Sequence, residues 1–197
     1  MKHHTVSDNK CTQDHVCHGD QQCSRKTVGN HAAKATIDIA LQPASVRQEL
    51  AYLGDANSFP LAVWSGMPLN PRLGHKLLLG IRADEDAFVS LFTVSASGKT
   101  ARLMENRRFL AGRTQDFPSA SSRVDFQLRA PAGVESFVAV ASRQPLPVLL
   151  PGDVMRGGDL APLRLNSAQL ADRIHSATAG MPSGSWNVAV VDIQTNP

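Results

Sequence analysis

The stretch AFVSLFTVSASGKTARLM, residues 87–104, contains two expected strands and the turn that joins them. Residues 87–94 are apolar at almost every position, which is typical of a strand covered on both faces. The residues Ser97-Gly98-Lys99-Thr100 end like a phosphate-binding loop, but Thr93 stands where that loop needs its first glycine. A short strand also follows instead of a helix. We therefore expect a hairpin turn with Gly98 at positive φ, and no nucleotide site.

Further strands are expected on both sides of this hairpin. They are residues 35–42, 59–66, 75–83, 123–130, 135–142 and 185–193, each bounded by Gly, Pro or Ser turns. Short helices are expected at 43–54 and 167–177. Eight or so short strands predict an all-β fold, an antiparallel β-sandwich of the immunoglobulin-like type with one or two short helices. We expect this single domain to span residues 34–197.

Composition and charge exclude several classes of function. The chain has 197 residues, 42% of them hydrophobic, and a formal net charge of only +3. No apolar run is long enough to span a bilayer. The sequence also lacks the combination of basic residues and stacking aromatic residues that is typical of nucleic-acid binding. Residues 1–33 are polar and are expected to form a flexible, disordered tail. They contain no apolar leader, so the cytoplasm is the default expectation for localisation.

The tail contains a cluster of potential metal ligands, in the sequence CTQDHVCHGDQQC. Thiolate and imidazole groups bind zinc or copper, and four of these residues could close a tetrahedral site. The spacing is neither the short CxxC of a zinc knuckle nor the CxxCH of a haem site. An unligated tail is therefore favoured, and a zinc or copper site is the alternative. The candidate ligands are Cys11, His15, Cys17, His18 and Cys23.

Catalytic constellations are not found in residues 34–197. No G-x-S-x-G elbow occurs, and cysteine is absent. The two histidines, His75 and His175, have no triad context. The acidic turn at residues 84–86 lacks the alternating carboxylates of a calcium loop, so a solvated turn is expected. We expect no enzyme activity and no cofactor.

Two segments are candidates for binding another protein. The first is an expected basic loop with Arg107, Arg108, Phe109 and Arg113. The second is the apolar run in RQPLPVLLPGDV, residues 143–154, where Leu149 and Leu150 are the candidate contacts. This run has an alternative role as a crossover that covers the core.

The segment from His75 to Leu146 resembles a bacterial family, domain of unknown function 4384. The resemblance rests on three stretches in order: LLLGIRADEDAFVSLFTVSASGKTARLMEN, RRFLAGRTQDFP and FQLRAPAGVESFVAVASRQPL. The closing SWNVAVVDI is similar to the family's last strand, which extends the resemblance to about residues 60–195. One departure is Glu105, which stands where the family commonly has a proline before Asn106.

The resemblance implies an exported or envelope-associated bacterial protein, because the family is often found there and also beside caspase-like peptidases or protein kinases. No catalytic residues are established for the family, so none is transferred. Together with the sequence, this predicts a non-enzymatic protein-binding or accessory module of an envelope- or secretion-associated assembly. Metal binding by the Cys/His tail is the alternative function.

Overall fold

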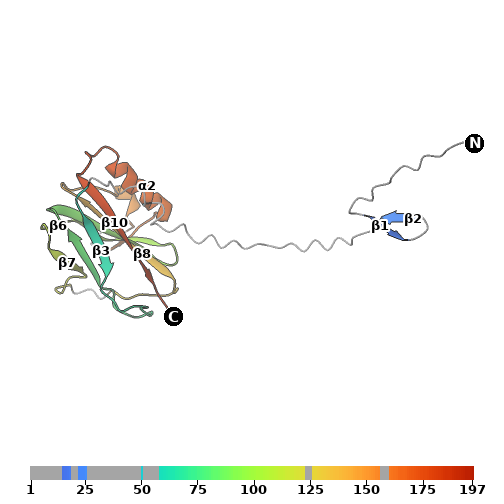
Figure 1. Ribbon diagram of the computed structural model, residues 1–197. Helices are drawn as coiled ribbons and strands as arrows, with labels where there is room; N and C mark the ends of the chain where they lie inside the picture. Colours follow the sequence, from blue (N-terminus) through green and yellow to red (C-terminus); the bar gives the residue numbers. More distant parts are fainter. Residues whose placement is uncertain (1–14, 19–21, 26–49, 51–57, 123–125, 156–159) are drawn as a thin grey trace, which may run out of the picture. The chain divides into compact units, whose positions relative to one another are not determined.

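The structure is a computed structural model that describes residues 15–18, 22–25, 50, 58–122, 126–155 and 160–197 (Figure 1). The chain divides into two compact units, residues 1–40 and 41–197. The first unit contains an antiparallel hairpin of β1 (His15–His18) and β2 (Gln22–Arg25). This hairpin lies within residues 1–33, the segment that we expected to be a flexible tail. The expected strand at 35–42 lies outside the described residues.

The second unit is mostly β, with two antiparallel sheets and one described α-helix. The five-stranded sheet has the order β10-β8-β5-β6-β9 and the three-stranded sheet the order β3-β4-β7. The larger sheet comprises β5 (Ala87–Val94), β6 (Thr100–Phe109), β8 (Val134–Ser142), β9 (Ala161–Pro162) and β10 (Trp186–Gln194). The smaller comprises β3 (Leu61–Ser65), β4 (Leu79–Ala83) and β7 (Thr114–Phe117). The expected all-β class is confirmed.

A first apolar core contains side chains from both sheets. Successive strand residues face opposite sides of a sheet, so alternate positions of β5 and β8 reach this core. Its members include Ile81 of β4, Val89 and Leu91 of β5, and Phe137 of β8, all buried. Burial of this kind contributes about 25 cal/mol per Å² of apolar surface and is the main force that holds the two sheets together.

A second apolar core lies on the opposite face of β5 and β8. Phe92 and Val140 face helix α2 (Ser167–Thr178), which contributes Leu170 and Ile174. The central strands are therefore covered on both faces, as their continuous apolar sequence predicted. The helix begins where expected because Asn166 caps it, accepting a bond from the Gln169 amide at 2.9 Å.

The second core also includes part of the proline-rich segment. Leu146, Val148 and Leu149 are buried in it, together with Leu50. Leu50 is the single described residue of the expected helix at 43–54, and it is helical. The apolar run after β8 therefore covers the core, as the alternative for this run proposed.

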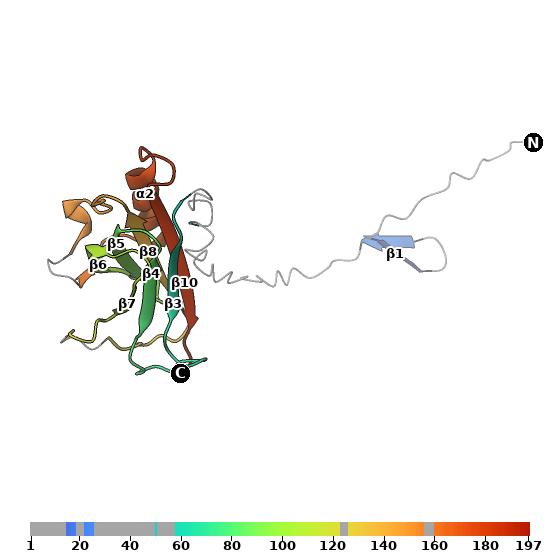
Figure 2. The same ribbon diagram turned by 60° about the vertical axis from the view of Figure 1, so that its left-hand side comes forward.

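The two sheets meet along β3 and β10, which lie side by side (Figures 1 and 2). The Ser58 hydroxyl donates to the Trp186 carbonyl, and the Asn187 amide donates to the Phe59 carbonyl at 2.8 Å. Nearby, Leu73 N–H donates to the Asn196 carbonyl at 2.9 Å. These bonds join the sheets on one side, and the opposite side is bordered by β6 and β7.

Trp64 of β3 packs flat against β4. It is the cross-strand partner of Gly80, and its indole ring occupies the space where a Cβ of residue 80 would lie. The absence of a side chain at Gly80 therefore lets the ring rest on the backbone, with Trp64 still 39% exposed.

One expected strand is largely replaced by irregular structure. Of residues 123–130, those at 123–125 lie outside the described residues, and Gln127 forms a single bridge with Lys76. Leu128 N–H donates to the His75 carbonyl at 3.0 Å, and Leu77 N–H to the Phe126 carbonyl at 2.8 Å. Backbone pairing therefore persists at this place without a regular strand.

A kink interrupts β6 at Asn106, which has a φ of 45°. The register between β5 and β6 shifts here, as in a β-bulge. Asn106 N–H donates to the Ser90 hydroxyl at 3.0 Å, and Asn106 Oδ1 accepts from Leu146 N–H at 2.8 Å. Asn106 thus connects β6 to the start of the core-covering segment.

The turn between β5 and β6 is the predicted hairpin. Gly98 has a φ of 77°, its N–H donates to the Ser95 carbonyl at 2.7 Å, and Ser95 N–H donates to the Lys99 carbonyl at 2.8 Å. A strand follows, so the geometry of a phosphate-binding loop is not present at this turn.

We expect the Gly98→Val variant to lower the free energy of unfolding by about 1 kcal/mol or more, because a branched side chain is strained at positive φ. Lys99→Ala, a change in the same turn with no such strain, should leave it nearly unchanged. Urea denaturation measures both effects. Equal stability of the two variants would contradict the role assigned to the glycine.

Candidate functional site

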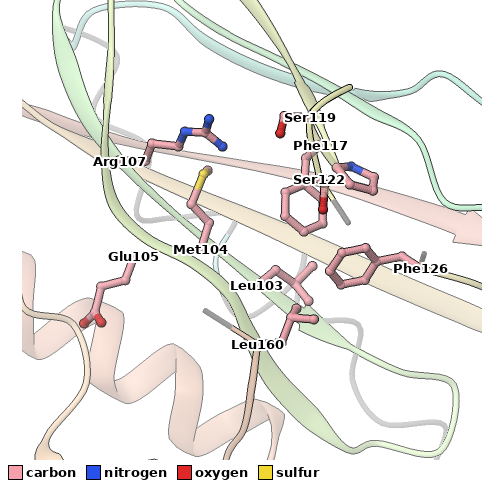
Figure 3. Close-up of a pocket in the computed structure, with 10 residues that line it drawn as sticks. Leu103, Met104, Glu105, Arg107, Phe117, Ser119, Ser122, Phe126 and Leu160 are labelled. Carbon is pink, nitrogen blue, oxygen red and sulfur yellow. The ribbon is translucent and has the colours of Figure 1, made fainter. Parts of the chain in front are cut away.

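A cavity of about 530 Å³ opens along β6 of the larger sheet (Figure 3). Residues of β6, of the segment after β7 and of the approach to β9 surround it. They are Leu103, Met104, Glu105, Arg107, Phe117, Pro118, Ser119, Ser122, Phe126 and Leu160. Its size is within the range of sites that bind small molecules or single side chains of a partner.

The cavity lies against a free strand edge. The edge strand β9 pairs with β6 only at Ala101 and Arg102. Beyond Arg102, the outer side of β6 has no strand neighbour in the part of the chain that the structure describes. Such an edge presents backbone N–H and C=O groups that can pair with another strand.

The wall opposite β6 is aromatic. The rings of Phe117 and Phe126 lie with their centroids 4.9 Å apart and their planes tilted by 56°. Leu103 and Met104 on the β6 side are largely buried, and Leu160 is half-buried. The lining is therefore mixed: these side chains form an apolar part that suits an apolar group, whereas Glu105, Arg107, Ser119 and Ser122 make the rest polar.

The rim of the cavity carries one uncompensated charge. Glu105 forms an ion pair with Arg102, so its carboxylate is already neutralised. Arg107 is exposed and forms no ion pair within the described residues. Its side chain lies beside that of Met104 (Figure 3). An anionic group on a ligand would thus find a free guanidinium at this place.

The expected basic loop is mostly strand. Arg107 and Arg108 belong to β6, and the turn is limited to residues 110–113, where Arg113 N–H donates to the Leu110 carbonyl at 3.1 Å. Phe109 is buried in the first core, so this residue is not available to a partner. Arg113 is exposed in the turn, and only Arg107 of this group lines the cavity.

The three carboxylates of the acidic turn each bond an arginine, as Asp84 does with Arg82, Glu85 with Arg143 and Asp86 with Arg108. The Ala111 N–H, which donates to the Asp86 carboxylate at 2.8 Å, and the Arg108 guanidinium lower the pKa of that carboxyl. The turn is therefore an exposed set of ion pairs.

The second candidate segment is divided between core and surface. Leu149 is buried, which removes it from any binding surface, whereas Leu150 is 55% exposed. The 3-10 turn η1 (Pro151–Asp153) follows, and Asp153 accepts from Leu150 N–H at 2.8 Å and from Arg173 Nε at 2.8 Å. The Arg173 bond, with a smaller contribution from the Leu150 amide, lowers the pKa of the Asp153 carboxyl.

The candidate metal ligands lie in the first unit. Cys17 and Cys23 are direct partners across the hairpin, His15 pairs with Arg25, and His18 with Gln22. Cys11 lies outside the described residues. Within the described residues, no group of three potential ligands is placed to hold a metal ion.

Comparison with known families identifies one domain. Residues 71–145 match the family described as "Domain of unknown function (DUF4384)". The resemblance predicted from the sequence is thereby confirmed for these residues, which include β4 to β8 and most of the cavity lining. The match is shorter than the expected 60–195 and ends before α2 and β10. No curated protein and no solved structure matches the chain.

The sequence contains no apolar run long enough to span a bilayer. Among the described residues, no helix has the length and apolar character needed to cross a bilayer.

Proposed function

We propose that this protein is a non-enzymatic binding module that takes an extended peptide of a partner protein along the outer edge of β6. The single observation that carries the proposal is that, among the described residues, the edge of β6 beyond Arg102 has no strand partner and borders a partly apolar cavity. An added strand gains backbone hydrogen bonds from the edge, and its alternate side chains enter pockets beside it. The two sheets would then form an immunoglobulin-like sandwich with its binding site at one open side.

The cavity also defines the chemistry of the peptide. Met104 and Arg107 are three residues apart in β6, but the bulge at Asn106 lies between them, so the paired strand β5 advances only two residues, from Val89 opposite Arg107 to Leu91 opposite Met104. An apolar side chain opposite Met104 and an acidic one opposite Arg107 would satisfy both the apolar part of the lining and the free cation. The ligand is therefore an extended segment with an apolar and an acidic residue about two positions apart, which places both on one face of the added strand.

The lining of the cavity supports a binding role more than catalysis. Its two charged members are Glu105, which is paired with Arg102, and Arg107, whose guanidinium donates hydrogen bonds but accepts none. Neither histidine of the second unit lines it. Ser119 and Ser122 line the cavity, but no histidine or cysteine is among its described lining residues to form the activated pair of a nucleophilic catalyst. In keeping with the family resemblance, we place the partner in a bacterial envelope- or secretion-associated assembly.

Selection of random decapeptides on the immobilised protein tests the proposal. We expect enriched sequences to combine an apolar and an acidic residue at the stated spacing. Arg107→Glu should weaken binding of these peptides by about tenfold, or 1.4 kcal/mol, because attraction becomes repulsion. Fluorescence anisotropy with the labelled peptides measures the loss.

Arg108→Glu is the matched control, since it makes the same charge change one residue away, outside the cavity. It should leave peptide affinity nearly unchanged. The assigned site would be refuted if the selected peptides shared no acidic position, or if the two variants lost peptide affinity equally. A second copy of the chain as occupant would appear instead as concentration-dependent dimerisation in light scattering.

A further inference from the structure

The β1–β2 hairpin brings two cysteines of the N-terminal unit to directly opposite positions. Cys17 of β1 is the cross-strand partner of Cys23 of β2. Directly opposite residues of an antiparallel pair have Cα atoms about 4.5 or about 5.5 Å apart, depending on the hydrogen-bonding position. Both values lie within the range of about 4.4–6.8 Å that a disulfide spans. The backbone register therefore allows a direct bond between these residues.

The same register argues against a closed metal site in the hairpin. Side chains alternate between faces, so His15 shares a face with Cys17 and Cys23, whereas His18 belongs to the other face. Three ligand-type residues on one face are fewer than the four that a closed zinc site needs. The cross-strand partner of His15 is Arg25, a residue type that does not serve as a metal ligand.

The register of the hairpin places a basic residue near the two cysteines in the sequence of β2. A neighbouring cation stabilises a thiolate, and the thiolate is the form that attacks a disulfide. Cys23 and Arg25 are two residues apart on β2 and so share a face.

We propose that Cys17 and Cys23 are a redox-active pair that forms a reversible intramolecular disulfide across the hairpin. The oxidant is a low-molecular-weight disulfide of the glutathione type. One cysteine thiolate attacks a sulfur of the oxidant, forms a mixed disulfide and releases one small thiolate, which takes up a proton. The second cysteine thiolate attacks the protein sulfur of the mixed disulfide and releases the other. Two protein thiols are oxidised, and one small disulfide is reduced to two thiols.

The sequence offers a matched control for this pair. Five residues separate Cys11 from Cys17, and five separate Cys17 from Cys23. The full-length variants Cys11→Ser and Cys23→Ser therefore each retain two cysteines with the same spacing. Only Cys11→Ser retains the pair that the hairpin places opposite one another.

The variants are equilibrated in buffers with different ratios of reduced to oxidised glutathione, then quenched in acid and alkylated. Mass spectrometry of the intact proteins measures their oxidation. Cys11→Ser should lose the mass of two hydrogens and resist alkylation. It should remain half-oxidised at a ratio of reduced to oxidised glutathione at least about tenfold higher than Cys23→Ser requires. Parallel samples receive zinc alone, followed by dialysis and elemental analysis.

Similar titrations of the two variants, or only glutathione adducts on Cys11→Ser, would overturn the proposal. A metal site would also overturn the proposal. It would be shown by stoichiometric zinc that survives dialysis and protects the wild-type thiols from oxidation. This zinc would be lost when all three cysteines are replaced with serine. Preferential oxidation of Cys11→Ser without retained zinc supports it.

Discussion

Replacing Asn106 with alanine should lower the free energy of unfolding by about 3 kcal/mol, from two separate causes. The first is the loss of the acceptor for Leu146 N–H, which leaves a half-buried amide unpaired at a cost of about 1–3 kcal/mol. The second is strain, because alanine tolerates the φ of 45° less well than asparagine does, at about 1 kcal/mol. Urea denaturation at neutral pH measures the sum.

Two further variants at this position separate the causes. Asn106→Gly removes the acceptor but accommodates the positive φ, so its loss should be smaller than that of the alanine variant. Asn106→Asp keeps an acceptor and a residue that tolerates this backbone conformation, so its loss should be smaller still. Stability close to wild type in the alanine variant would show that Asn106 does not hold the segment after β8 in place.

Replacing Asp153 with alanine should cost about 2 kcal/mol at neutral pH. Its buried carboxylate holds the Leu150 amide and both the Nε and Nη2 atoms of Arg173, the last at 3.1 Å. Removing it leaves a guanidinium and an amide without their acceptor. Thermal and urea denaturation measure the loss, with Asp172→Asn as the control because it alters an exposed carboxyl of the same helix.

The Asp153 contribution should depend on pH in a defined direction. Its pKa is lowered in the folded state, chiefly by the Arg173 bond. The stabilisation is therefore fully present above the pKa of an unfolded aspartate, about 3.9, and is lost as the pH falls through the lower folded value. The stability difference between wild type and Asp153→Asn should shrink below about pH 4. A difference that persists unchanged into strong acid would contradict the ion pair.

Local patterns were sufficient to predict the elements whose sequence and environment agree. Residues 87–94 are apolar throughout, and β5 is covered on both faces as a result. The helix at Ser167–Thr178 has an N-cap and a single apolar face, both visible in the sequence. Gly98 was identifiable because few other residues suit a tight hairpin turn.

The candidate site could be predicted only in part, because it depends on distant segments. Arg107 was singled out from a basic run, but the length of β6, which places Phe109 in the core, was not visible. The cavity wall contains Phe126, which is close to Phe117 only in the folded chain. The short β9, which pairs with β6 only at Ala101 and Arg102, could not be predicted either, because its pairing joins distant segments of the chain.

The register of the β1–β2 hairpin could not be predicted from the sequence, for a different reason. Residues 1–33 contain few large apolar side chains, so they were not expected to form a core. That composition neither predicts nor excludes a two-stranded hairpin. The sequence between the two strands, residues 19–21, contains a Gly-Asp pair, which is a weak signal for a chain reversal.

The contact between Trp64 and Gly80 has a practical consequence for measuring this molecule. The chain has two tryptophans, and each sheet carries one, Trp64 on β3 and Trp186 at the start of β10. Each sheet therefore contains its own fluorophore, and the indole on Gly80 is separated from its backbone support when β3 leaves β4. In variants with one tryptophan changed to phenylalanine, the emission would follow the two sheets separately. Coincident curves would mean that the sheets unfold as one cooperative unit.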